Sequence, residues 1–116
     1  VSGNVIEDGG HVYQEGCGVL AQNMQDTVIA HNEIRHFRYT GVSTGWTWGY
    51  GPTNTRNTST RFNHIHHIGE GWLSDMGCVY TLGHQPESEV RNNVCHDVQS
   101  FNCKSQLLLC VPLVSC

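Results

Sequence analysis

One five-residue pattern, Asn-x-Ile/Cys-x-His/Asp, recurs along this chain and constrains its fold more than any other feature. Its asparagines lie 28, 31 and 30 residues apart, at Asn4, Asn32, Asn63 and Asn93. A second short element follows the first three copies, at residues 18–20, 41–43 and 77–80. Near-constant spacing of short β-prone elements is typical of a solenoid. The sequence therefore predicts an all-β protein, a right-handed parallel β-helix of about four coils, rather than an irregular antiparallel β domain.

Stacking of equivalent positions predicts which side chains share a column. Successive coils of a parallel β-helix are about 4.8 Å apart, so each copy of the pattern lies directly above the next. We expect an inward apolar column of Ile6, Ile34, Ile65 and Cys95. The asparagines should form a second inward column, whose amides bond to the coils above and below. The positions expected to face outward are Val5, Glu7, Glu33, Arg35, His64, His66, Val94 and His96.

Composition agrees with a β fold and argues against two classes of partner. Thirteen glycines, nine asparagines and nine threonines favour turns and strands over helices. The formal net charge is −4 and only 14% of residues are charged, which indicates no basic patch for nucleic acid or anionic lipid. The longest apolar run, residues 107–114, is too short to span a bilayer. We expect neither a nucleic-acid nor a membrane partner.

The repeat stops at Val98, and residues 99–116 have a different character. This segment lacks glycine and holds Cys103, Cys110 and Cys116, half of the six cysteines. We expect coils over residues 1–98 and a divergent apolar tail over 99–116. The tail either caps the open end of the solenoid or derives from an alternative exon, a frameshift or a gene-model error. The apolar character of the tail favours an alternative exon, a frameshift or a gene-model error over a cap. Because the chain opens at Val1 without a Met or a charged signal-peptide region, we expect it to be a piece of a longer protein.

The cysteines permit several disulfide pairings, but their spacing matches no zinc motif of the C-x-x-C type. Cys95 falls in the isoleucine column, while Cys17 and Cys78 each follow a glycine before a strand. We expect all three to behave as small buried hydrophobic residues. The tail cysteines are compatible with a secreted, oxidising setting.

Three groups of residues are candidates for chemistry. The first is the glycine-rich aromatic segment 45–52, in which Trp46, Trp48 and Tyr50 either present flat rings to a sugar or pack on one another. The second is the histidine run of the third repeat. His64 and His66 lie about 7 Å apart on one face of a strand, a geometry that suits zinc, but no third ligand is indicated. We therefore expect solvent-facing histidines and assign no metal site and no cofactor.

The third group lies in residues 69–77, where Asp75 sits near Trp72 and five residues after Glu70. Two carboxylates can act as acid and as base or nucleophile in glycoside hydrolysis, and an apolar wall can raise the pKa of the acid. The alternative is that Asp75 only caps a turn. His67 shares a column with Asp8, His36 and Asp97, which is typical of a hydrogen-bonded stack.

Three blocks of sequence resemble glycoside hydrolase family 141, a group of pectin lyase-like parallel β-helix proteins that includes an α-L-fucosidase acting on pectic polysaccharide and a xylanase. The blocks are TGVS at 40–43 with GWTWGYGP at 45–52, RFNHIHHIG at 61–69, and LSDMGCVYTLG at 73–83. The resemblance covers residues 1–98 and implies a carbohydrate-active protein in which Asp75 matches the first catalytic acid. The chain departs from the family at Cys78, where a glycine is usual, and at His84.

The resemblance also shapes the functional expectation. The family's second acid lies on the next coil in a Thr-Asp-Glu-Gly run, whereas this chain has QSFNCK at 99–104. We therefore expect this chain to be part of an extracellular glycoside hydrolase that acts on plant or complex polysaccharide, and to be inactive by itself. The alternative is that the chain is a non-catalytic glycan-binding β-helix. The candidate catalytic residues are Asp75 and Glu70. The candidate polysaccharide- or oligosaccharide-binding residues are Trp46, Trp48, Tyr50, His67, Trp72 and Tyr80.

Overall fold

The computed structural model describes residues 1–101, which form ten strands and no helix. The strands are β1 (Val5–Gly9), β2 (Val19–Ala21), β3 (Gln25–Ala30), β4 (Glu33–Phe37), β5 (Val42–Gly45), β6 (Arg56–Arg61), β7 (His64–Ile68), β8 (Val79–Leu82), β9 (Glu89–Arg91) and β10 (Val94–Val98). Because this part of the chain holds no helix, it offers no helical segment long and apolar enough to cross a membrane.

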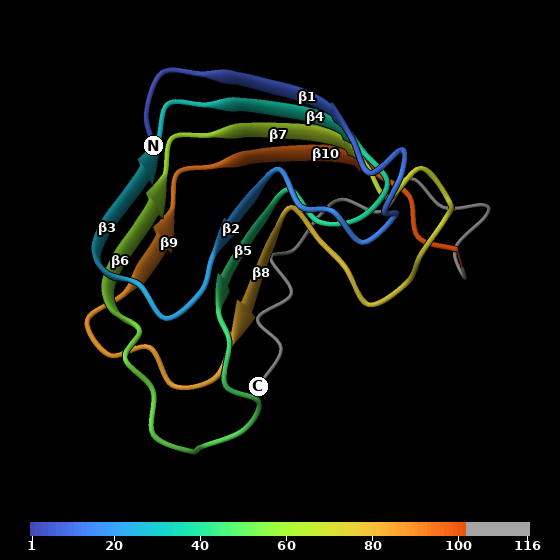
Figure 1. Ribbon diagram of the computed structural model, residues 1–116. Helices are drawn as coiled ribbons and strands as arrows, with labels where there is room; N and C mark the ends of the chain where they lie inside the picture. The colour runs from blue at the N-terminus through green and yellow to red at the C-terminus, as the bar shows by residue number, and fades with distance from the viewer. Residues whose placement is uncertain (102–116) are drawn as a thin grey trace.

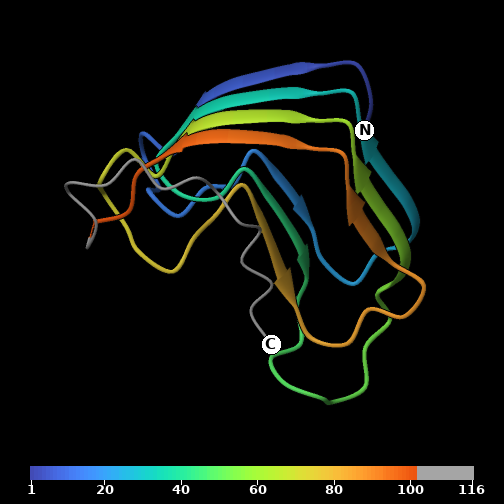
Figure 2. The same ribbon diagram turned by 180° about the vertical axis from the view of Figure 1, so that it is seen from behind.

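The strands stack into three parallel sheets, ordered β1-β4-β7-β10, β2-β5-β8 and β3-β6-β9. Each coil contributes one strand to each sheet, so the chain winds as a solenoid (Figures 1 and 2). This arrangement confirms the predicted parallel β-helix.

The number of coils differs from the prediction. The described residues complete about three turns rather than four, because only the first sheet has a fourth strand, β10. The fourth copy of the asparagine pattern begins a turn, and no second or third strand follows it within residues 1–101. Most of the segment predicted to form a divergent tail, residues 102–116, lies outside the described residues.

The strand register confirms the predicted apolar column. Ile6 pairs with Ile34, Ile34 with Ile65, and Ile65 with Cys95. Ile34 and Ile65 are fully buried, and Phe37 lies in the same core. Burying one such side chain contributes about 1.5–3 kcal/mol, so the column supplies a large part of the driving force for stacking the coils.

The asparagine column also forms as predicted. The Asn4 amide Nδ2 donates to Asn32 Oδ1 at 3.1 Å, Asn32 Nδ2 to Asn63 Oδ1 at 2.9 Å, and Asn63 Nδ2 to Asn93 Oδ1 at 3.0 Å. The same oxygens also accept from the backbone NH groups of Asn4, Asn32 and Asn63. Since Asn32 and Asn63 are almost fully buried, these bonds satisfy polar groups that have no access to water.

A left-handed residue ends the straight part of each strand in the first sheet. Asp8, His36, His67 and Asp97 have φ values of 59°, 55°, 53° and 52°, a region that Asp, Asn and His tolerate better than most residues. The left-handed residue lies between two registered pairs, such as Arg35–His66 and Phe37–Ile68. It is therefore an extra outward residue at the corner of every coil.

A disulfide joins Cys78 to Cys95 across the interior, with the Cα atoms 6.1 Å apart. It connects β10 to the segment that enters β8, and both residues pack with the apolar core. The prediction that these two cysteines are separate small hydrophobic residues is therefore wrong, although their inward placement is confirmed. Cys17 is half-buried and unpaired among the described residues, and burial raises the pKa of its thiol to about 11.

Candidate functional site

Six of the eight predicted site residues fall on loops at opposite ends of the sheet β2-β5-β8, while Tyr80 lies within β8 and His67 within β7. The segment 69–78 leads into the first residue of β8, whereas the segment 46–55 leaves the last residue of β5. Because β5 and β8 run parallel, one segment lies at each end of the sheet (Figure 1). Glu70, Trp72 and Asp75 therefore lie at one end of the sheet, and the rings of the segment 45–52 lie at the other.

Asp75 and Tyr80 are brought together at the first of these ends. Asp75 is exposed and adopts a left-handed backbone with φ 54°. The Tyr80 hydroxyl donates to Asp75 Oδ2 at 3.0 Å, and the Tyr39 hydroxyl donates to the Asp75 backbone oxygen at 2.9 Å. Two tyrosines thus hold the turn and orient the carboxylate.

Burial and the neighbouring carboxylate change the acidity of these tyrosines. Burial raises the pKa of Tyr80 to about 12, and the hydrogen bond to Asp75 acts in the same direction. Burial also raises the pKa of Tyr39, with a smaller contribution from the charge of Asp75. Tyr80 therefore stays protonated at neutral pH and remains a donor to the carboxylate.

Sequence reasoning missed Tyr39, although a signal for it existed. Val42 pairs with Val79, so equivalent residues of these two coils are separated by 37 positions. That offset sets Tyr39 beside Met76, the neighbour of Asp75. Aligning the coils by their second elements, rather than by the asparagines alone, would have identified this contact.

The Trp72 ring has a partner that the sequence did not indicate. The Arg38 guanidinium lies over the indole, with Cζ 4.3 Å from the ring centroid. A cation over an aromatic face is attracted by the ring quadrupole. One face of Trp72 is therefore occupied by Arg38, and the ring is 47% exposed.

Glu70 and His67 point toward the histidine-rich corner of the first sheet instead of toward the Asp75 carboxylate. Glu70 Oε1 lies 3.5 Å from His36 Nδ1, and His67 Nε2 lies 3.9 Å from Asp97 Oδ2. The rings of His36 and His67 are 5.0 Å apart. The two predicted carboxylates therefore have different partners. His67 lies beside His36 and Asp97 in its column, while its ring nitrogen Nδ1 makes a hydrogen bond to His66 of the same strand.

The aromatic segment at the other end of the sheet exposes its rings. Trp46, Trp48 and Tyr50 are 53%, 71% and 94% exposed. The base of the segment is held by close backbone contacts: a Cβ at Gly45 would collide with the Leu82 carbonyl, and one at Gly83 with the Thr47 carbonyl. Three large exposed rings therefore project from an anchored base.

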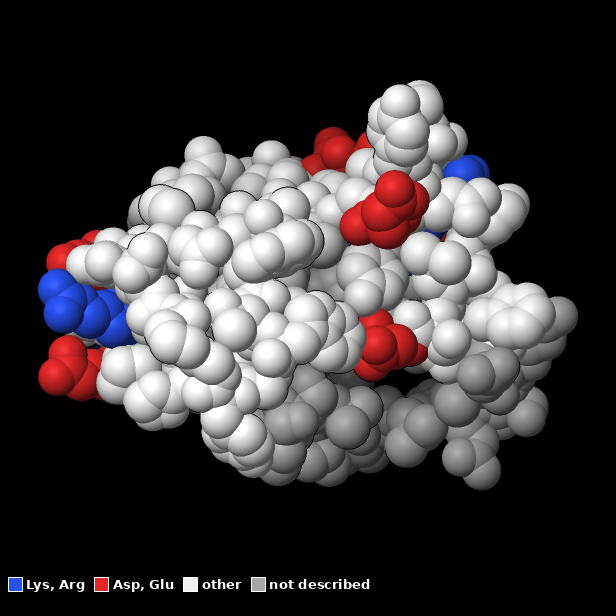
Figure 3. Space-filling model, turned by 60° about the horizontal axis from the view of Figure 1, so that its bottom comes forward, with Lys and Arg blue, Asp and Glu red and all other residues white. Residues whose placement is uncertain are grey.

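Figure 3 shows one face of the molecule, and that face is mainly uncharged. Acidic side chains are scattered over it, and basic side chains lie at its edges. No continuous basic surface appears there, in agreement with the net charge of −4.

No protein-family model, no curated protein and no solved structure matches this chain.

Proposed function

We propose that this chain is a glycan-binding β-helix of a carbohydrate-active protein, and that Trp46, Trp48 and Tyr50 form its contact with sugar. The observation that carries the proposal is the exposure of these three rings on one anchored segment. Water solvates large aromatic faces poorly, and exposed apolar groups gathered at one place mark interaction sites. Flat rings of this kind stack on the C–H faces of pyranose sugars, while the Tyr hydroxyl and Trp NH remain available for hydrogen bonds.

Two further observations support a polysaccharide as the ligand. The sequence blocks at 40–52, 61–69 and 73–83 resemble glycoside hydrolase family 141, whose members act on pectic polysaccharide and xylan. The Cys78–Cys95 disulfide is typical of proteins from oxidising compartments, where such polymers occur. We accordingly propose an extracellular location.

Hydrolysis is the second candidate function, and the Asp75–Tyr80 pair favours it. A carboxylate oriented by a tyrosine hydroxyl at 3.0 Å could act as acid or base on a glycosidic oxygen. Glycosidases need a second carboxyl group facing the first across the bond, about 5–9.5 Å away. Glu70 is engaged with His36, so we propose that hydrolysis belongs to a larger parent enzyme and that this chain alone binds without turnover.

Retention of the full chain in gels containing pectic polysaccharide or xylan tests the proposal. An aromatic stacking contact contributes about 0.5–1.5 kcal/mol, so we expect Trp48→Ala or Tyr50→Ala to weaken binding roughly two- to tenfold. Tyr13→Ala is the matched control, because Tyr13 is 74% exposed on a different segment. Absence of retention by the wild-type chain on both polymers, or equal losses in Trp48→Ala and Tyr13→Ala, would exclude the aromatic segment as the binding surface.

Asp75→Asn separates binding from catalysis. We expect this variant to bind polysaccharide as the wild type does, and neither protein to release reducing sugar. Turnover by the wild-type chain that is lost in Asp75→Asn would instead establish the enzymatic function.

A further inference from the structure

Three adjacent strands place four metal-binding side chains on the outer face of the first sheet. Glu33 of β4 pairs in register with His64 of β7, and His66 of β7 pairs with His96 of β10. Side chains two positions apart on a strand return to the same face, so His64 and His66 are neighbours there. The four side chains therefore lie on one outer area that spans three consecutive coils.

Their potential ligand atoms are close together. One ligand atom from each of Glu33, His64 and His66 lies within 4.8 Å of the other two. Glu33 Oε1 is 3.3 Å from His66 Nε2, and His64 Nε2 is 2.7 Å from His96 Nε2. Tetrahedral zinc with bonds of about 2.0–2.1 Å holds its ligand atoms roughly 3.3 Å apart. The Glu33 and His66 atoms already have this spacing, whereas those of His64 and His96 must move apart to admit an ion.

The rings of this cluster are crowded and share few protons, an arrangement that suits a cation. The ring centroids of His64 and His66 are 4.3 Å apart, and those of His66 and His96 are 5.0 Å apart and nearly parallel. Charged imidazolium groups at such distances repel one another. Neutral imidazoles that face each other through nitrogen either share one N–H as a hydrogen bond or direct their lone pairs at a common cation.

His66 differs from an ordinary surface histidine. It is on the outward face, as the sequence predicts, yet only 8% exposed, because its neighbours on that face cover it. Its Nδ1 lies 2.7 Å from His67 Nδ1, while Nε2 faces Glu33. The imidazole is therefore held in one orientation, with Nε2 directed to the centre of the cluster.

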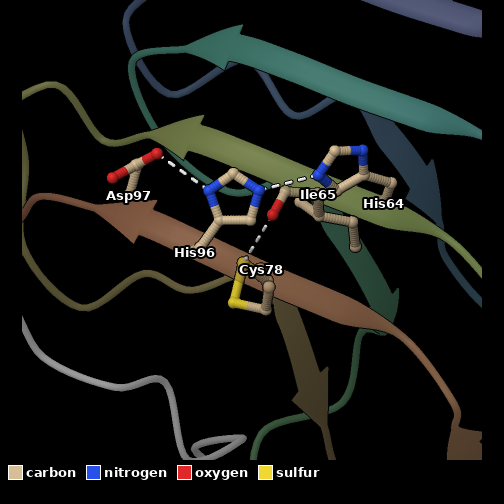
Figure 4. Close-up of a disulfide and its surroundings, with 6 residues drawn as sticks. His64, Ile65, Cys78, His96 and Asp97 are labelled. Atoms are coloured by element: carbon tan, nitrogen blue, oxygen red, sulfur yellow. Dashed lines mark hydrogen bonds and ion pairs between the residues drawn. A yellow bond between two sulfur atoms is a disulfide. The ribbon is translucent and has the colours of Figure 1, made fainter.

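Partners outside the cluster orient two of its members. Asp97 Oδ2 accepts from His96 Nδ1 at 2.8 Å, which turns His96 Nε2 toward His64 (Figure 4). Arg35 Nη1 donates to Glu33 Oε1 at 2.9 Å and holds that carboxylate over the sheet. A carboxylate on the far nitrogen of a ligating histidine is the usual outer partner in zinc sites.

We propose that Glu33, His64 and His66 bind a divalent transition-metal ion of the zinc class, with His96 in the fourth position and Asp97 as its outer partner. Two imidazoles and one carboxylate are a ligand set that zinc accepts, and a third imidazole completes a tetrahedron. The ion links β4, β7 and β10 and so joins three coils on the side opposite the core. This inference does not depend on the proposed glycan binding.

Calorimetric titration of the full, untagged chain with zinc chloride tests the site. Free thiols, Cys17 among them, are first alkylated, because thiolates would otherwise compete for zinc. We expect one ion per chain, an upward shift of the thermal midpoint on zinc addition, and tetrahedral visible bands when cobalt replaces zinc. Absence of binding, or octahedral cobalt bands indicating a water-ligated surface ion, would overturn the proposal.

Substitutions assign the ligands. We expect Glu33→Gln and His66→Gln to abolish stoichiometric binding, and Asp97→Asn to weaken it about 10–100-fold, as losses of outer partners do. His84→Gln is the matched control, since His84 is an exposed histidine on another part of the chain. Far-ultraviolet circular dichroism of each metal-free variant checks its fold. Tight binding that persists in correctly folded Glu33→Gln and Asp97→Asn, or that His84→Gln reduces equally, would refute this ligand set.

Discussion

The asparagine column makes a quantitative prediction, because one of its members can be removed without touching the apolar core. In Asn63→Ala, four groups lose a partner: Ile29 O and Asn93 Oδ1, to which Asn63 Nδ2 donates, and the Asn32 backbone NH and Nδ2, from which Asn63 Oδ1 accepts. Two of the four keep another bond, since Asn32 Nδ2 also donates to Val1 O and Asn93 Oδ1 also accepts from the Asn63 backbone NH.

The Asn32 backbone NH sets the magnitude, because Ile29 belongs to the paired strand β3 and its carbonyl also faces the neighbouring coil. A buried polar group left without its partner costs about 1–3 kcal/mol, so Asn63→Ala should lower the free energy of unfolding by roughly that amount. Small domains have a total stability of about 5–15 kcal/mol, so the loss is a large fraction of what holds the coils together. The site is 1% exposed, and water cannot replace the missing amide without opening the corner.

Urea denaturation followed by tryptophan fluorescence and by far-ultraviolet circular dichroism measures the loss, and coincidence of the two transitions licenses a two-state fit. Asn4→Ala is the matched control. Asn4 is exposed at the end of the column and donates only to Ser2 O and to Asn32 Oδ1 with its side chain. Because water can take over these bonds, we expect a cost below about 1 kcal/mol there. Equal costs for Asn63→Ala and Asn4→Ala would refute the argument that burial gives the column its strength.

Three further predictions concern the disulfide and two ionisable groups. Cys95→Ser opens a cross-link with a sequence separation of 17 and should cost about 3 kcal/mol in the chain-entropy model, measured by urea denaturation; an unchanged midpoint would contradict it. Hydrogen bonds, of which the one from Ser59 has the largest effect, lower the pKa of Glu89 below 4.5 in the folded state. As the pH falls, the unfolded chain is therefore protonated at Glu89 before the folded chain is. Stability from Glu89 is therefore present above pH 4.5 and lost as the pH falls through the folded-state pKa, and Glu89→Gln should flatten this acid limb of a pH series of urea denaturations. Tyr80 should ionise near pH 12, and Asp75→Asn should move its pKa toward 10, as phenolate absorbance would show; a titration that the substitution leaves unchanged would disprove the contact.

Much of the fold could be predicted because a solenoid repeats one local geometry. The strand pairs Ile6–Ile34 and Ile34–Ile65 follow directly from the asparagine spacing, since equal coils bring equivalent residues into register. The number of turns could not be obtained in this way. The asparagine pattern marks only one of the three strands in a coil, so counting it adds a turn that β10 only begins.

The candidate sites were less predictable, because they depend on contacts that cross from one column to another. The sequence set Glu33 and His64 in one outward column, but the 3.3 Å approach of Glu33 to His66 runs diagonally between columns and depends on side-chain rotation. The bond between Cys78 and Cys95 likewise spans the interior from one sheet to another. Stacking rules describe neighbours along the solenoid axis, and they contain no information on partners across it.

The division between inward and outward columns also bears on which residues call for a functional explanation. The coils are held together by the inward-pointing side chains of the isoleucine and asparagine columns. The backbone hydrogen bonds within the three sheets also hold them. Outward positions are free of that constraint, and small polar residues suffice there. Three histidines and a glutamate converge on one outward area, where neither inward column requires them. A row of stacked imidazoles carries an electrostatic cost whenever the rings are protonated. The proposed ion takes the place of those protons and links three coils, and this is the physical reason for proposing a metal-dependent property on this face.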